Sequence, residues 1–384
     1  MSSVCFFNAK ILDSDQKCFF DGALLCENGV ITKIYRDGDH PSHADEKIDL
    51  GGAYLIPGLT DAHTHGRDGY DFTSADEQGM KTMLKGYASR GVTTLFPTLA
   101  SAPFDILLGQ GAMIRSFKTN TNGAHVAGVH LEGRYLNPKK GGAHAHELLA
   151  LPAVDEVDAI VESLGLPLHV SAAYELDKDE SFIEKLVSLG ATAGLAHTEA
   201  DFETVHHLYE KYGISLTHTF NAMPPLHHRD GGAVCAGLCD DMYIELICDG
   251  IHVAPEMVRL TYKVKGADRL VLVTDSMEAT DSPDGEYSIA GNPVIVKDSI
   301  ARTPAGNLAG STLNLLDAVN NLVRFAGATL EEAVLCATIN PCRMLGIDKE
   351  YGSIEEGKKA DLLTVSISDN KISLLSVYAS AKKV

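Results

Sequence analysis

Residues 54–66 read YLIPGLTDAHTHG, a short apolar run that leads into a loop carrying Asp61, His63 and His65. In an extended chain, alternate side chains point to the same side, so His63 and His65 could bind one metal ion together. A chain with 16 histidines also produces such a pair by chance, so the pair alone decides little. The metal hypothesis depends on whether similar residues follow the other apolar runs.

Seven more apolar runs follow, and segments of helical length separate many of them. Continuous apolar strands that alternate with helices predict a parallel sheet covered on both faces. Eight such units in about 290 residues favour an α/β protein with a (β/α)8 TIM-like barrel. A doubly wound sheet is the alternative, but no GxGxxG motif follows the first run. The expected strands are residues 54–60, 92–97, 125–130, 168–172, 191–196, 214–219, 243–248 and 270–274, and the clearest expected helices are residues 78–90, 181–189, 202–212 and 254–263.

The two chain ends have a different pattern, with short strands and turns. Asn28-Gly29 lies between two apolar runs, which is a strong signal for a β-hairpin. Neither end is long enough to form a good core alone. We therefore expect a small β-sandwich domain built from residues 1–55 and 347–384, beside a catalytic barrel of residues 56–346.

The composition excludes several kinds of partner. A formal net charge of −20 argues against nucleic acid, and no apolar run is long enough to span a membrane. The first residues lack the basic and apolar regions of a secretory signal. The eight cysteines form no CxxC pair, which is typical of reduced thiols. We expect a cytoplasmic protein.

Metal-binding and acidic residues gather where the expected strands end, which is the catalytic face of such barrels. Three candidate metal ligands, Glu132, His197 and His218, lie on separate strands, and imidazole with carboxylate suits zinc and similar divalent ions. Each could instead be a buried hydrogen-bonded side chain or a helix cap. Asp275 follows the eighth run and could act as a general base and acid, or as an N-cap.

Three loops are further candidates for substrate binding. The segment NPKKGGAHAH, residues 137–146, suits a mobile substrate loop or a plain surface turn. In HTFNAMPPLHHRDGG, residues 218–232, Asn221 could bind hydroxyl groups, and Arg229 beside two histidines could bind phosphate or pair with surface acids. The turn at residues 308–311 could present backbone N–H groups to a ligand or simply start a helix.

The whole chain resembles a known family, the N-acetylglucosamine-6-phosphate deacetylases of the amidohydrolase superfamily. HTFNAM with HHR, followed by LVTDS and LAGS, is more specific than the general amidohydrolase pattern. The fourth expected strand has no lysine, unlike families in which a carboxylated lysine bridges two metals. The matching motifs are PGLTDAHTHG, HLEG, GGAHAHEL, AHT, HTFNAMPPLHHRDGG, CDGIHV, LVTDS, LAGS and GSIEEGKKADLL.

The resemblance implies a role for each matching residue. Glu132, His197 and His218 match the main metal ligands, and His63 with His65 match a pair that holds a second metal in some members. Asp275 matches the catalytic acid/base, and His144 matches the residue that polarises the substrate carbonyl. The positions that match substrate-binding residues are Ala143, Asn221, Ala222, Arg229, His252, Leu308, Ala309 and Gly310.

The resemblance also implies a cofactor, a substrate and a partner. The cofactor is one or two divalent metal ions, with Zn²⁺ expected, and Fe, Mn, Co or Ni would also suit the ligands. The substrate is a phosphorylated N-acetyl amino sugar, used in amino-sugar catabolism or recycling. A homodimer would carry Arg229 and His252 into the neighbouring active site, which would give the phosphate a basic pocket despite the acidic chain.

The expected reaction is hydrolysis of the acetamide of N-acetyl-D-glucosamine 6-phosphate to D-glucosamine 6-phosphate and acetate. A metal-activated water attacks the carbonyl, and Asp275 takes and returns the proton. Three alternatives remain: the galacto epimer as substrate, a different amidohydrolase reaction such as deamination, and a non-enzymatic sensor or assembly protein on the same scaffold.

Two departures from the family pattern affect this expectation. Arg134 stands where the family usually has proline, and it could pair with the metal carboxylate or contact substrate. Residues 171–175, SAAYE, replace a usual Ala-Pro-Glu segment.

Overall fold

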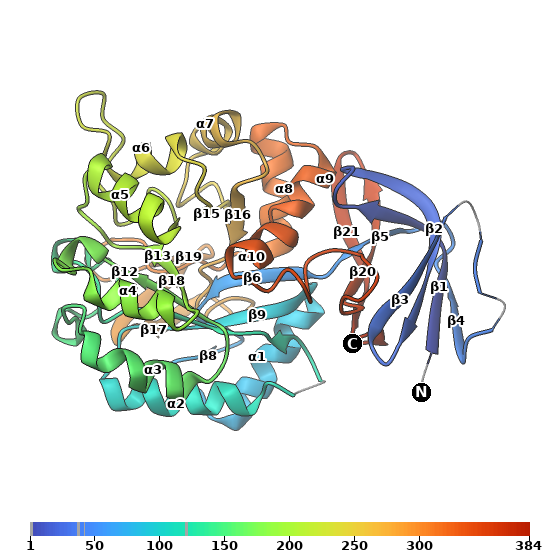
Figure 1. Cartoon of the computed structure of the whole chain (residues 1–384), viewed down its shortest axis with the longest axis horizontal. Helices are drawn as coiled ribbons and strands as arrows, with labels where there is room; N and C mark the ends of the chain where they lie inside the picture. Colours follow the sequence, from blue (N-terminus) through green and yellow to red (C-terminus); the bar gives the residue numbers. More distant parts are fainter. Residues whose placement is uncertain (1–2, 37–38, 42, 120–121) are drawn as a thin grey trace.

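A ring of parallel strands forms the centre of the larger part of the molecule (Figure 1). The computed structural model describes residues 3–36, 39–41, 43–119 and 122–384. Residues 1–2, 37–38 and 42 belong to the expected N-terminal part of the small β domain and lie outside the described residues. The ring strands are β6 (Leu59–Thr64), β9 (Val92–Leu99), β10 (His125–Val126), β11 (Val129–Glu132), β12 (Leu168–Ala172), β13 (Thr192–Leu195), β14 (Ser215–Leu216), β15 (Ile244–Ile247) and β16 (Leu270–Val273).

Each ring strand pairs in parallel with the next, and β10 and β11 together fill one position beside β9. The last strand position is joined to the first because the Asp275 N–H donates to the His63 carbonyl at 2.9 Å. At the opposite end of this seam, the Thr60 N–H donates to the Ala337 carbonyl, and the Leu272 N–H donates to the Cys336 carbonyl. The predicted (β/α)8 barrel is confirmed.

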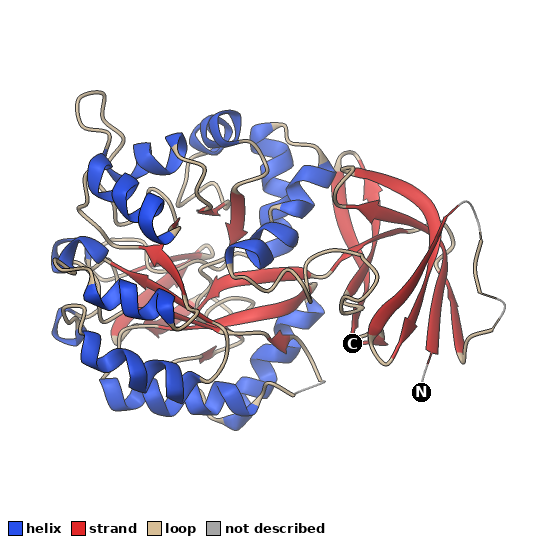
Figure 2. Cartoon of the chain, viewed as in Figure 1, coloured by secondary structure: helices blue, strands red, loops and turns tan. Residues whose placement is uncertain are grey.

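Helices cover the outside of the ring (Figure 2). The helix at residues 202–212 shows why these segments are helical: Asp201 caps its first turn by accepting from Thr204 N, and Gly213 ends it with φ +66°. Its buried residues, Val205 and Leu208, pack toward the barrel. The helices are α1 (Glu77–Ser89), α2 (Phe104–Ser116), α3 (Val157–Leu164), α4 (Ser181–Ser188), α5 (Phe202–Tyr212), α6 (Gly232–Cys239), α7 (Pro255–Lys265), α8 (Leu315–Ala326), α9 (Leu330–Leu335) and α10 (Ile339–Met344).

Alternation along the strands separates the core from the site. In β11, Leu131 belongs to the large hydrophobic core between strands and helices. Its neighbours His130 and Glu132 are also buried, and they face the other way, into the barrel. Burying such a leucine contributes about 1.5–3 kcal/mol. In β11 the apolar half of the strand therefore holds the ring together while the other half is available for polar groups.

The first expected barrel strand, residues 54–60, is wrong because this run crosses from one sheet to another. β5 (Tyr54–Pro57) pairs with both chain ends, parallel to β1 and antiparallel to β20. The chain then passes through Gly58, and β6 begins the barrel at Leu59. Residues 55–60 are buried on both sides of Gly58, and Leu59 continues the apolar run, so the hydrophobic pattern does not show the change of sheet.

The small β unit is one continuous sheet formed from the two chain ends (Figure 1). It has its own core, which includes Phe6, Leu24 and Leu362. Asn28 and Gly29 both have positive φ, at 52° and 81°, as the predicted Asn-Gly hairpin requires. The domain boundaries given above remain predictions. The strands are β1 (Ser3–Asp13), β2 (Cys18–Glu27), β3 (Val30–Arg36), β4 (Glu46–Asp49), β5, β20 (Leu362–Ser368), β21 (Lys371–Ala379) and β22 (Lys382–Lys383).

A further small sheet follows the last barrel strand, and the sequence patterns did not predict it. Its strands are β17 (Gly285–Ile289), β18 (Asn292–Lys297) and β19 (Ile300–Arg302).

Within the described part of the chain, no helix has the length and apolar character needed to cross a membrane. The remaining elements are the hairpin β7 (Gly66–Arg67) with β8 (Tyr70–Asp71), and the 3₁₀ turns η1 (Pro138–Lys140), η2 (His146–Leu148), η3 (Val154–Glu156) and η4 (Tyr174–Leu176).

Gly58 should tolerate no side chain, because a Cβ atom there would lie 2.0 Å from Thr93 Oγ1. We predict that Gly58→Ala lowers the free energy of unfolding by about 1–3 kcal/mol, the usual cost of overpacking. The matched control is Gly109→Ala in α2, where nothing lies within 4 Å of the added Cβ. The control should be stabilised by about 0.5–1 kcal/mol. Equal urea midpoints for the two variants would contradict the close packing at Gly58.

Candidate metal centre and active site

The candidate site lies at the carboxyl ends of the barrel strands. Glu132 is the last residue of β11, while His197, His218 and Asp275 each come two residues after a strand. These last three have positive φ, at 45°, 29° and 47°. Non-glycine residues in such conformations cost about 1–3 kcal/mol each and concentrate at functional sites. The chain therefore accepts local strain to turn these side chains inward.

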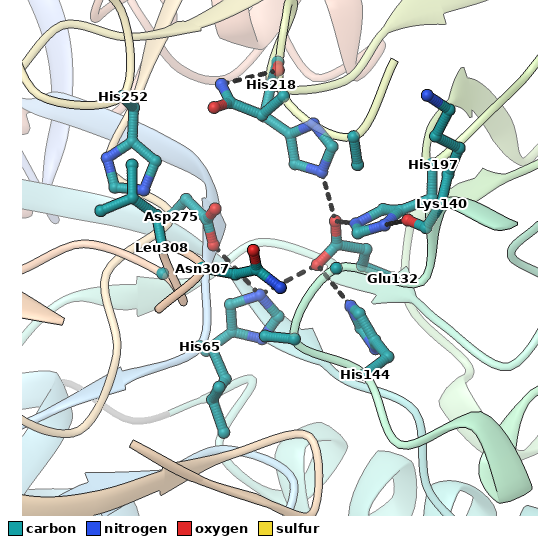
Figure 3. A pocket seen from close by; sticks show the side chains of 16 residues that line it. His65, Glu132, Lys140, His144, His197, His218, His252, Asp275, Asn307 and Leu308 are labelled. Carbon is teal, nitrogen blue, oxygen red and sulfur yellow. Dashed lines mark hydrogen bonds and ion pairs between the residues drawn. The ribbon is translucent and has the colours of Figure 1, made fainter. Parts of the chain in front are cut away.

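Glu132 is the centre of the cluster, and several side chains converge on it (Figure 3). Its Oε1 lies 2.9 Å from His218 Nε2 and 3.3 Å from His197 Nε2. Its Oε2 lies 3.0 Å from His65 Nε2 and 3.2 Å from His63 Nε2. The two oxygens thus serve two different pairs of histidines.

Asp275 completes the second group, with Oδ1 3.2 Å from His65 Nε2 and 3.5 Å from His63 Nε2. Ligand-type atoms of His63, His65, Glu132 and Asp275 all lie within 4.8 Å of one another, and so do those of Glu132, His197 and His218. All of these residues are buried. The structure therefore brings together the two candidate ligand sets, and Glu132 belongs to both.

Burial and charge shape the protonation of this cluster. Burial alone would raise the pKa of Glu132, but the nearby charge on His63 and hydrogen bonds from His197 and His218 hold that pKa well below its usual range. Burial lowers the pKa of His65, but Asp275 and Glu132 outweigh it and raise this pKa to about 9. The carboxylates are therefore ionised, and protons on His63, His65 and His218, whose pKa values the carboxylates raise, balance their charge. A divalent cation would replace those protons.

The geometry suits such a cation. Atoms bound 2.0–2.1 Å from a tetrahedral ion lie about 3.3 Å apart, close to the separations of Glu132 Oε1 from His197 and His218. His197 Nδ1 lies 2.7 Å from the Lys140 carbonyl and donates to it, so Nε2, which faces Glu132, is the ring atom left to bind a cation once it gives up its proton. This outer hydrogen bond is typical of metal-binding histidines.

Glu245, a buried carboxylate from β15, contacts two of the candidate ligands, His63 and His218. Its Oε2 lies 3.1 Å from His63 Nδ1 and accepts from the His218 backbone N–H at 3.2 Å. Its side chain is 0% exposed. One carboxylate oxygen therefore links candidate ligands on the first and sixth strand positions.

A cavity of about 350 Å³ opens above the cluster. The residues predicted from the sequence that line it are His65, Glu132, Ala143, His144, His197, His218, Asn221, Ala222, His252, Asp275, Leu308 and Gly310. His63 lies against the cluster without lining the cavity, and Ala309 is buried beside it at 1% exposed.

Of the two candidate phosphate-binding residues, His252 lines the cavity and Arg229 does not. His252 lines the cavity of its own chain, and its Nδ1 lies 2.6 Å from Asp249 Oδ2. The expectation that His252 serves the neighbouring subunit stays a prediction, and in this chain the short contact with Asp249 holds the ring at its own cavity. Arg229 is exposed, lies 3.1 Å from His228 Nε2, and is not among the residues that line the cavity.

Sequence analysis missed several residues of the cavity and its wall. Lys140 and Gly142 belong to the predicted substrate loop, so the signal was present but not assigned. Ile289 and Asn307 come from the β17–β19 region, where no sequence pattern predicted a strand or a site residue. Glu245 stands inside an apolar run, and a lone glutamate at such a position was a usable signal.

Arg134 and the segment at residues 171–175 have structural partners. Arg134 Nη2 lies 3.1 Å from Glu156 Oε1, and its guanidinium lies over the Phe104 ring. Arg134 therefore pairs with Glu156 and not with the metal carboxylate Glu132, while a contact of Arg134 with substrate stays a prediction. Ser171 Oγ lies 2.7 Å from His130 Nε2, and Glu175 Oε1 accepts from Asn137 Nδ2.

Comparison with known protein families matches residues 54–383 to the amidohydrolase family. Among curated proteins, the chain is 36% identical over 365 residues to an N-acetylglucosamine-6-phosphate deacetylase of Vibrio furnissii, which covers 94% of this chain and 91% of that protein. It is 34% identical over 360 residues to an N-acetylgalactosamine-6-phosphate deacetylase of Escherichia coli O157:H7, covering 93% and 94%. Among solved structures, an N-acetylglucosamine-6-phosphate deacetylase from Thermotoga maritima superposes with a TM-score of 0.88 at 32% identity, over 99% of both chains.

The cluster predicts a specific loss of metal on substitution. His218→Ala should weaken divalent-metal binding by at least about 100-fold, since loss of only an outer partner of a ligand already costs about 10–100-fold. The measurement is zinc titration of metal-free protein by calorimetry. The matched control is His207→Ala on the surface of α5, where the imidazole pairs with Glu180. If both variants bind zinc equally well, His218 is not a ligand.

Proposed function

The chain belongs to the amidohydrolase family and, within it, to the N-acetylglucosamine-6-phosphate deacetylases, and from this premise we propose that it hydrolyses the acetamide of N-acetyl-D-glucosamine 6-phosphate. The products are D-glucosamine 6-phosphate and acetate. The observation that carries the proposal is the convergence of two histidine pairs on Glu132, with Asp275 and His144 at the same cavity. Hydrolysis of an amide needs an activated water, a base and an oxyanion donor, and this arrangement has a candidate for each.

In this proposal Glu132, His197 and His218 hold a divalent ion, with Zn²⁺ as the first choice, and His63 and His65 offer a place for a second. When bound, such an ion lowers the pKa of a water molecule toward neutrality and polarises a carbonyl group. Two observations support this assignment, namely the spacing of the ligand atoms and the hydrogen bond that fixes His197.

Asp275 is the proposed base and acid. Burial would raise its pKa, but His63 and His65 outweigh burial and lower it to about 2. The carboxylate is therefore ionised at neutral pH and able to accept the proton of the attacking water. It then returns this proton to the amine as the C–N bond breaks.

His144 is the proposed donor to the carbonyl oxygen. Burial, and then the neighbouring His197, lower its pKa to about 3, so the ring is neutral. A neutral imidazole can donate one hydrogen bond to the negative charge that develops on the oxygen.

The substrate's sugar and phosphate need further contacts. We propose that Ala143, Asn221, Ala222 and the turn of Leu308, Ala309 and Gly310 bind the sugar. His252 would contact the phosphate from the same chain, and Arg229 would reach the site of a second copy in a homodimer. All eight cysteines are free thiols, which supports the proposed cytoplasmic location.

Acetate release tests the proposal directly. Purified, zinc-loaded protein should release acetate from N-acetylglucosamine 6-phosphate, a chelator should abolish the release, and added zinc should restore it. The unphosphorylated sugar should react more slowly, because it lacks the group that the basic residues bind. The same reaction on N-acetylgalactosamine 6-phosphate is the second candidate, since the Escherichia coli relative is 34% identical. Faster release from the galacto epimer would establish that function instead, and no release from either sugar would refute both.

Mixed dimers test the roles of Asp275 and Arg229 together. Asp275→Asn should lower kcat by about 10²–10⁴-fold, the usual contribution of general acid–base catalysis. Arg229→Ala should mainly raise KM for phosphorylated substrates. The two variants are mixed in equal amounts, unfolded and refolded together. If Arg229 acts across a two-fold interface, each mixed dimer has one site in which both Asp275 and Arg229 are intact. About one quarter of all sites in the mixture should then have wild-type activity. Activity that never exceeds the mean of the separate variants would contradict the action of Arg229 on a neighbouring site.

A further inference from the structure

The side chain behind His144 has no role in the mechanism above. Ser101 lies two residues beyond the end of β9 and is 2% exposed. Its Oγ lies 2.9 Å from His144 Nδ1 and 2.9 Å from the backbone nitrogen of Arg134. One buried hydroxyl therefore stands between a peptide group and the imidazole that faces the cavity.

The chemistry of the groups fixes the direction of the Arg134 hydrogen bond, and that bond limits what Ser101 can do toward His144. A backbone N–H only donates, so Ser101 Oγ accepts from Arg134. The hydroxyl proton of Ser101 is then available to His144 Nδ1, the one acceptor within hydrogen-bond reach of Ser101 Oγ among the described contacts. A neutral imidazole that accepts at Nδ1 carries its own proton at Nε2.

The Nε2 atom of His144 is on the reactive side of the ring. His144 lines the cavity, and its Nε2 lies 3.8 Å from Glu132 Oε2 (Figure 3). A proton at this atom is therefore presented beside the cluster where the substrate carbonyl has to bind. A proton at Nδ1 would instead point into the protein wall, toward Ser101.

The backbone beside Glu132 is shaped to make this arrangement possible. Gly133 has φ +142°, and a Cβ atom there would lie 2.4 Å from Ser101 N and 2.6 Å from Ser101 Oγ. Arg134 follows with φ 45°, another conformation that side chains disfavour. Two successive unfavourable conformations thus bring the Arg134 N–H to the serine hydroxyl, directly after the residue at the centre of the cluster.

We propose that Ser101 is a positioning residue. It accepts a hydrogen bond from the Arg134 backbone N–H and donates its hydroxyl proton to His144 Nδ1. It fixes the tautomer of His144 with the proton at Nε2, which donates to the carbonyl oxygen of the substrate. This inference rests on the proposed deacetylation and adds to it the group that selects the donor form of His144.

The test is a double-mutant cycle on acetate release, with zinc content measured for every variant. His144→Ala should lower kcat by about 10²–10³-fold, as loss of an oxyanion donor does. Ser101→Ala should lower kcat by about 5–10-fold, the contribution of one hydrogen bond, with KM and zinc content unchanged. In the His144→Ala background, Ser101→Ala should cause no further loss, because its effect passes through the imidazole. Ser101→Thr, which keeps the hydroxyl, should retain wild-type kcat.

The matched control is Ser215→Ala in β14, a buried serine whose hydroxyl donates to the Ala193 carbonyl, and it should not change kcat. Equal losses from Ser101→Ala in both backgrounds would overturn the proposal, as would a Ser101→Thr variant that folds but is as slow as Ser101→Ala. Nitrogen NMR of ¹⁵N-histidine-labelled wild-type protein gives a second readout that needs no turnover. A His144 signal of the Nε2–H tautomer supports the proposal, and a signal of the Nδ1–H tautomer overturns it. Failure of the deacetylation itself would appear separately, as absence of acetate in the wild type.

Discussion

The burial of the Glu132 carboxylate is the constraint on which the site depends. Moving a carboxylate out of water costs several kcal/mol unless hydrogen bonds and opposite charge compensate it. Glu132 is 2% exposed, and the described groups that compensate it are imidazoles. Imidazoles can exchange their protons for a cation at moderate pH, whereas a lysine or arginine would hold its charge permanently. The choice of histidine thus keeps the charge of this cluster exchangeable.

The alternation of side chains along a strand gives Glu132 a buried position that faces into the barrel. Alternation puts Leu131 into the core and Glu132 into the barrel, so one short strand serves both stability and chemistry. Beyond the strand ends, positive φ angles at His197, His218 and Asp275 redirect the chain so that side chains from separate strands meet. Packing of the apolar half of the ring provides the stability against which this local strain is held.

The sequence was sufficient for the barrel and for the strand-end residues, because both depend on local patterns. Apolar runs alternate with amphipathic segments, and the titratable residues directly follow the runs. The crossing at Gly58 was hidden because the chain is buried on both sides of it, although β5 and β6 belong to different sheets. The β17–β19 sheet, the Arg134–Glu156 pair and the Ser101–His144 contact depend on which distant segments meet, and residue order alone does not carry that information. The roles of the individual site residues remain predictions until the variants are measured.

The seam between β6 and β16 has a consequence for the biosynthesis of the protein. The His63 carbonyl and the Asp275 N–H form part of the bond that joins the first barrel strand position to the last. A chain emerging from the ribosome therefore carries Glu132, His197 and His218 long before Asp275 exists, so the ligand group that includes Asp275 is completed after the other. Contacts so distant in sequence form late, since loop closure is costly. An ion captured early would be held by a site that lacks Asp275, the proposed base, so the proposed reaction would begin only when the last strand has joined the first.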